Sequence, residues 1–130
     1  MLWFSKTRPR DIWDDPVEQP LGDIEAAHKI RAICRGAADS AEKLGKPAGR
    51  PAKKQQAERD RYERAAKVAM EIAMKISDQL MRDAAVREIV GLCMKANNIK
   101  TARALYRAIH AGEIKAELLK EHPTLEGEQG

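Results

Sequence analysis

The residues best suited to chemistry in this chain lie in a basic stretch, residues 43–54, which holds five lysine or arginine residues and no acidic residue. The whole chain of 130 residues has a formal net charge of only +4, so this stretch carries more than the entire excess. Charge concentrated in this way favours contact with a polyanion, whereas the near-neutral remainder argues against a protein coated uniformly with bases. The candidate nucleic-acid-binding side chains are Lys43, Lys46, Arg50, Lys53 and Lys54.

The centre of this stretch reads Gly49-Arg50-Pro51. Gly49 allows the backbone to approach a surface closely, and Pro51 keeps Arg50 extended. The narrow minor groove of A·T-rich DNA attracts an inserted arginine, while flanking lysines meet phosphates and add affinity that falls with salt. Residues 45–54 resemble the AT-hook, a short DNA-binding peptide with a Gly-Arg-Pro core, although Ala48 stands where the hook has a second arginine. The resemblance implies that Arg50 inserts into a minor groove; the alternative is a soluble basic linker between two helices.

A second candidate site is aromatic and lies near the start of the chain. Trp3, Phe4 and Trp13 are three of only five aromatic residues, and they fall in a proline-containing segment without a periodic apolar pattern. Such a segment is typical of an extended arm. Two interpretations remain open: the aromatic residues fold back over a core of small side chains, or they are anchors that dock into a partner's groove.

Catalytic and metal-binding patterns are weak. His28, His110 and His122 are far apart and have no ligand neighbours at helical spacing. Cys34 and Cys93 make no metal or redox spacing, which favours a reduced, cytoplasmic setting. We therefore predict no catalytic residue, no metal, no cofactor and no small-molecule substrate, and we expect that the protein is not an enzyme.

The composition indicates the kind of element that must position these residues. Aromatic residues make up only 4% of the chain and alanine is abundant, which favours closely packed helices over a sheet. No run of 18 apolar residues is present, so we expect no membrane contact. The sequence predicts an all-α protein with an extended arm over residues 1–22, a helical domain over 23–122 and a disordered tail over 123–130.

Three main helices are predicted within that domain. The first begins near Asp23, and the second is one long central helix, because residues 52–90 contain neither glycine nor proline. The third follows Asn97-Asn98, a pair that tolerates left-handed backbone angles, and it forms a C-terminal helical hairpin over residues 83–113 with the end of the long helix. The long helix also favours modest self-association into a dimer.

The hairpin allows three interpretations. It resembles a single tetratricopeptide-type repeat, which implies a peptide-binding groove, although such arrays need about three repeats to bury a core. As a DNA-binding helix-turn-helix, its second helix would present Lys100, Thr101, Arg103 and Arg107 to the major groove. The third interpretation is a hairpin that serves packing alone.

Two functions follow from these patterns. The first is a small helical nucleic-acid-binding accessory protein that contacts DNA through its basic loop. The alternative is a helical adaptor or chaperone-like module that docks through its aromatic arm and binds no nucleic acid.

Overall fold

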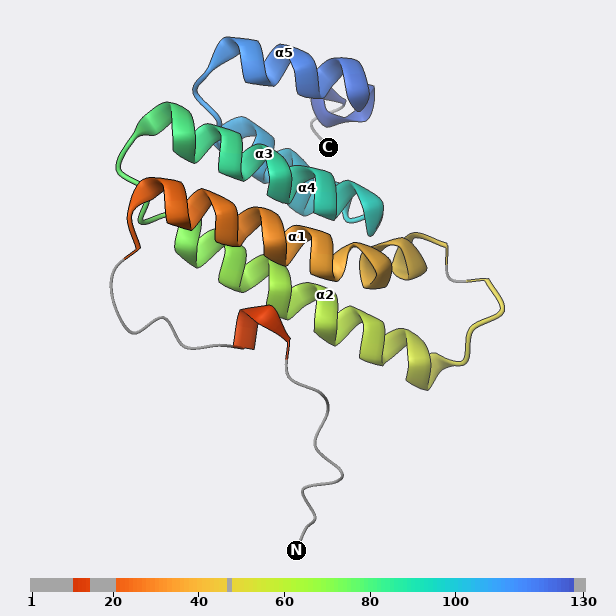
Figure 1. Ribbon diagram of the computed structural model, residues 1–130. Coiled ribbons are helices and arrows are strands. Elements are labelled where there is room, and N and C mark those ends of the chain that lie inside the picture. The colour runs from red at the N-terminus through yellow and green to blue at the C-terminus, as the bar shows by residue number, and fades with distance from the viewer. Residues whose placement is uncertain (1–10, 15–20, 47, 128–130) are drawn as a thin grey trace, which may run out of the picture.

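The computed structural model describes residues 11–14, 21–46 and 48–127, and in this part of the chain it contains helices and no strand. The prediction of an all-α protein is therefore confirmed for the described residues. The α-helices are α1 (Asp23–Gly45), α2 (Ala52–Ala73), α3 (Gln79–Lys95), α4 (Ile99–Ala108) and α5 (Gly112–Glu121). Two short 3-10 helices, η2 (Ile12–Asp14) and η3 (Pro123–Glu126), flank them (Figure 1).

The core is built from small and branched side chains on α1, α2 and α3. Ala37 and Ala41 on α1 and Ala65 and Ala69 on α2 are completely buried. Side chains this small let two helix backbones approach closely, and α1 packs most extensively against α2 and α3. Larger residues fill the rest of the interior, namely Ile30, Ile33, Ile76, Ile89, Val90 and Leu92.

The predicted long central helix is wrong, because the chain turns between Ala73 and Gln79 and forms two helices. Asp78 ends the turn as the N-cap of α3, and its carboxylate accepts a hydrogen bond from the Met81 amide at 2.8 Å. An aspartate at this position satisfies an amide that the first helical turn would otherwise leave unpaired. The prediction was based on the absence of glycine and proline alone, and neither residue is needed to end a helix at this turn.

Asp23, the first residue of α1, fixes this turn. Its carboxylate accepts hydrogen bonds from the backbone amides of Ser77 and Asp78, each at 2.9 Å. These bonds lower the pKa of Asp23, because they favour the ionised carboxylate. The start of α1 is thereby tied to the corner between α2 and α3.

The C-terminal part contains two helices, so five α-helices replace the predicted three in the described chain. Asn97 has a φ of 60°, which confirms the predicted left-handed turn, and Asn98 caps α4 by accepting from the Thr101 amide. The chain turns again before α5, where the buried Asp83 carboxylate accepts from the amides of His110 and Ala111. A buried carboxylate with two donors is thus satisfied.

The described parts of the predicted arm and tail are folded. Trp13 in η2 is only 4% exposed and lies against Gly36, where an added Cβ would be 3.4 Å from the indole ring. The Arg61 guanidinium lies over the same ring, 4.9 Å from its centre. In η3, Leu125 is 2% exposed, so residues 123–126 are not part of a disordered tail.

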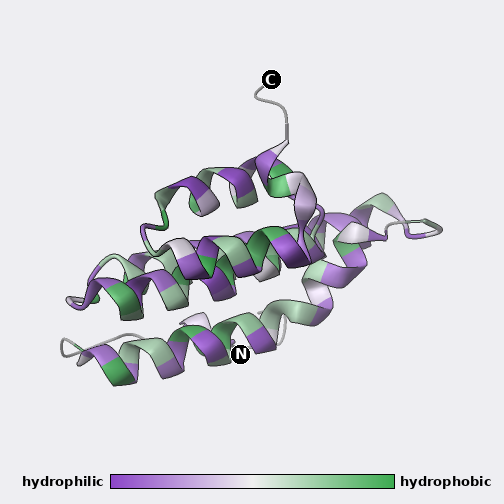
Figure 2. Ribbon diagram, turned by 90° about the horizontal axis from the view of Figure 1, so that it is seen from above, coloured by the Kyte–Doolittle hydropathy of each residue, from purple (hydrophilic) through white to green (hydrophobic). Residues whose placement is uncertain are grey.

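Hydrophobic and hydrophilic residues are interleaved along every helix in Figure 2. This is the pattern of helices that bury one face and expose the other. No helix in the described part of the chain is long and apolar enough to span a bilayer.

Candidate nucleic-acid interface

Lys43 is engaged inside the fold. Its ammonium lies 3.0 Å from the Asp39 carboxylate and 3.5 Å from that of Glu58, which joins α1 to α2. The hydrogen bond to Asp39 and the negative charge of Glu58 raise the pKa of Lys43. Glu58 also accepts a 2.6 Å hydrogen bond from the buried Ser40 hydroxyl. Lys43 is therefore held between two carboxylates and stabilises the contact between α1 and α2.

Arg50 is also engaged within the loop. One guanidinium nitrogen donates to the carbonyl of Lys46 at 2.9 Å and to that of Lys43 at 3.3 Å. These carbonyls belong to the last turn of α1 and its C-cap, where backbone acceptors lack helical partners and the helix dipole is negative. The Gln55 amide in turn donates to the Arg50 carbonyl at 3.2 Å. Arg50 therefore fastens the loop to the end of α1, in contrast to the outward orientation that the AT-hook resemblance implies.

The other three basic residues of the loop are exposed. Lys46 is the C-cap of α1, and Lys53 and Lys54 lie in the first turn of α2. No ion pair joins these three lysines to a carboxylate of the described residues. The first turn of α2 contains no acidic side chain, and its N-cap, Pro51, makes no side-chain cap. Because the positive end of a helix dipole adds to the lysine charges, this corner attracts anions.

The aromatic docking site is only partly described. Trp13 is buried in the chain's own core, which agrees with the fold-back interpretation and removes it as an exposed anchor. Trp3 and Phe4 lie outside the described residues.

The four polar residues of α4 that a helix-turn-helix would present to DNA are of two kinds. Three are exposed, namely Lys100, Thr101 and Arg107. The Arg103 guanidinium instead donates to the Thr124 carbonyl at 2.8 Å and helps to hold η3. Arg107 lies in the last turn of α4 and Lys100 in the first, so the two are at opposite ends of the helix.

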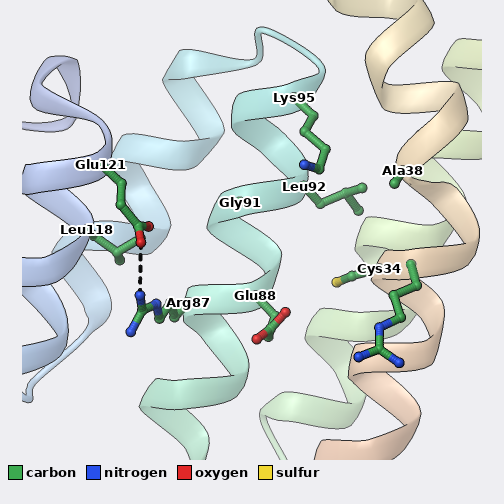
Figure 3. Close-up of a pocket in the computed structure, with 10 residues that line it drawn as sticks. Cys34, Ala38, Arg87, Glu88, Gly91, Leu92, Lys95, Leu118 and Glu121 are labelled. Atoms are coloured by element: carbon green, nitrogen blue, oxygen red, sulfur yellow. Dashed lines mark hydrogen bonds and ion pairs between the residues drawn. The ribbon is translucent and has the colours of Figure 1, made fainter.

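A cavity of about 300 Å³ lies over the outer side of α3, between α1 and α5 (Figure 3). Gly91 forms part of its floor, and a Cβ added there would meet nothing within 4 Å. Arg87 forms ion pairs with Glu117 and Glu121 on the α5 side. On the α1 side, burial raises the pKa of Cys34 to about 12. A thiol with such a pKa stays protonated near neutral pH and is a poor nucleophile.

Lys95 lies at the edge of this cavity and was missed by the sequence reasoning. It stands in the last turn of α3 and is exposed. The available signal was the chain's longest stretch without acidic residues, 89–112, which surrounds it.

Comparison of the chain with protein-family models, with curated proteins and with solved structures finds no match.

Proposed function

We propose that this protein is a small helical accessory protein that binds the phosphate backbone of double-stranded nucleic acid through its loop at residues 43–54. The observation that carries the proposal is the group of three exposed lysines, Lys46, Lys53 and Lys54, without carboxylate partners among the described residues. Lysines presented in this way release counterions when they meet phosphates, which supplies sequence-independent affinity.

The remaining two basic residues of the loop act as positioning residues. Lys43 joins α1 to α2 through carboxylates, and Arg50 holds the loop on the carbonyls that end α1. The Arg50 guanidinium already has these acceptors, so we do not propose that it reads bases in a minor groove. The exposed lysines of the loop contact phosphates instead. Binding should therefore show little preference for A·T over G·C duplexes.

The described aromatic residues favour a duplex over a single strand. Trp13, Tyr62 and Tyr106 are each no more than 5% exposed. Single-strand binders stack bases on exposed aromatic side chains, and none of these three offers such a platform.

Titration of a labelled DNA duplex at several salt concentrations tests this function. Three phosphate contacts give a slope of log affinity against log salt of about −2.7, equivalent to a roughly 40-fold loss between 50 and 200 mM salt. Replacing Lys53 and Lys54 by glutamine should reduce that slope by about 1.8. The matched control replaces two other exposed lysines, Lys67 on α2 and Lys75 in the turn after α2, which removes the same charge far from the loop. Equal slopes for the two variants, or no binding by the unaltered protein, would reject the proposal.

A protein-interaction function is the second candidate, supported by apolar side chains at the other end of the bundle. Ile24, Met74 and Leu80 are between 62% and 70% exposed, and all three lie within four residues of the contact between Asp23 and the α2–α3 corner. Exposed apolar groups of this size occur at protein interfaces. Co-purification from cells with and without nuclease distinguishes the two candidates, because only a protein partner is retained after nuclease treatment.

A further inference from the structure

The longest stretch without acidic residues in the chain is a second stretch, outside the loop at 43–54. Residues 89–112 include two lysines and two arginines and no aspartate or glutamate. The stretch covers the second half of α3, the turn at Asn97-Asn98 and all of α4. In the sequence, most of α2 and the first half of α3 separate it from the loop at 43–54, so charge counting along the chain does not connect the two.

The fold brings one end of this stretch to the loop. Gly45, in the last turn of α1, lies so close to α3 that an added Cβ would be 2.3 Å from the Lys95 carbonyl oxygen. The Asn98 side chain donates to the Tyr62 hydroxyl at 2.9 Å, which ties the following turn to α2. In Figure 1 the ends of α1 and α3 lie at the same end of the molecule as the start of α2.

Two of the four basic side chains in the second stretch belong to this end of the bundle. Lys95 is in the last turn of α3 and Lys100 in the first turn of α4. Both are exposed, and no carboxylate of the described residues pairs with them. Arg103 instead holds the Thr124 carbonyl, and Arg107 lies at the far end of α4.

We propose that Lys95 and Lys100 join Lys46, Lys53 and Lys54 in one cationic face that binds phosphates of a nucleic-acid duplex. This inference rests on the proposed function and extends its site from a single loop to the whole end of the bundle. The face also contains the N-termini of α2 and α4, whose positive dipole ends favour anions. The negative ends of α1 and α3 lie there as well; the Arg50 guanidinium offsets the first, and Lys95, in the last turn of α3, offsets the second. Five lysines distributed over three helices and a loop contact phosphates across a wider area than the loop alone.

The number of contacts makes the test quantitative. Five phosphate contacts give a salt slope of about −4.5, or a roughly 500-fold loss of affinity between 50 and 200 mM salt, against about 40-fold for three. Replacing Lys95 and Lys100 by glutamine should reduce the slope by about 1.8, which makes the variant's loss about 12-fold smaller than that of the unaltered protein. The Lys53 and Lys54 variant should show the same reduction, and the Lys67 and Lys75 control should keep the original slope.

The outcomes distinguish failure of the wider face from failure of nucleic-acid binding altogether. If the Lys95 and Lys100 variant behaves as the control does while the Lys53 and Lys54 variant loses slope, the loop binds alone and the wider face is rejected. If the unaltered protein does not bind the duplex, both proposals fail. Stronger binding to vesicles containing anionic lipid than to duplex would replace nucleic acid by a membrane surface as the ligand.

Folding of the variants is checked separately. Lys95 lies at the C-terminus of α3, where a positive charge stabilises the helix, so its removal lowers the melting temperature slightly. The single variant Lys100→Gln avoids this loss of stability. A positive charge at the N-terminus of α4 is unfavourable, so its removal does not unfold the protein. This single substitution should reduce the slope by about 0.9.

Discussion

At the scale of single residues, the same side-chain types perform different tasks according to what their charges meet. Lys43 and Arg50 bind acceptors of the protein itself, whereas Lys46, a close neighbour of both, extends into solvent. The sequence shows five bases without an acid, which made all five candidates for contact with a ligand. It could not separate them, because the acceptors of Lys43 include Glu58, which lies on another helix.

Trp13 offers a direct test of its place in the core. Replacing Trp13 by alanine should lower the free energy of unfolding by about 3–5 kcal/mol, because a buried indole leaves a large cavity. Trp13→Phe should cost less, since no described residue accepts a hydrogen bond from the indole nitrogen and only packing is lost. Chemical denaturation followed by circular dichroism measures both values. An unchanged stability in the alanine variant would support a docking role instead.

The Asp23 carboxylate predicts a pH dependence of stability. Its pKa is lowered in the folded protein by two backbone amides, so the stabilisation is fully present above the unfolded value of about 4. It is lost as the pH falls from there through the lowered pKa of the folded state. Melting temperatures measured between neutral and acidic pH should fall less steeply for Asp23→Asn than for the unaltered protein. Identical pH profiles would mean that the carboxylate charge contributes nothing at this corner.

At the scale of elements, several helix boundaries were predictable from local signals. Asp23 marked the start of α1, Asn97-Asn98 marked the turn before α4, and glycine and proline ended α1. The α2–α3 corner was missed because residues 74–78 contain neither glycine nor proline. Ser77-Asp78 was an available N-cap signal, but its stabilisation by Asp23 comes from more than 50 residues away. Tertiary contacts of this kind are invisible to local patterns.

Replacing two helical glycines by alanine should change the free energy of unfolding in opposite directions. Gly45→Ala would place a Cβ against the Lys95 backbone, so it should lower the free energy of unfolding by about 1–3 kcal/mol. Gly91→Ala has open space and should raise it by about 0.5–1 kcal/mol, because alanine favours a helix interior more than glycine does. The two variants are controls for each other in one denaturation series. A stabilising Gly45→Ala would contradict the close contact between α1 and α3.

At the scale of the whole molecule, five exposed lysines lie at one end of the bundle and three exposed apolar side chains lie at the other. The end at the loop gathers Lys46, Lys53, Lys54, Lys95 and Lys100. The opposite end contains Asp23, Asp78 and the exposed Ile24, Met74 and Leu80. The all-α class could be predicted from composition, but this polarity could not, because it depends on which helix ends meet. The net charge of +4 does not reveal that these lysines lie at one end.

The approach of Gly45 to the Lys95 carbonyl has a consequence for the coupling between ligand binding and folding. An unfolded chain keeps both basic stretches but separates them, so the assembled face exists only in the native state. A polyanion that prefers this face then stabilises the native state by mass action, by about 2.7 kcal/mol at a ligand concentration one hundred times the Kd. The thermal stability of the protein would then rise with the concentration of nucleic acid around it, and added salt would weaken both together.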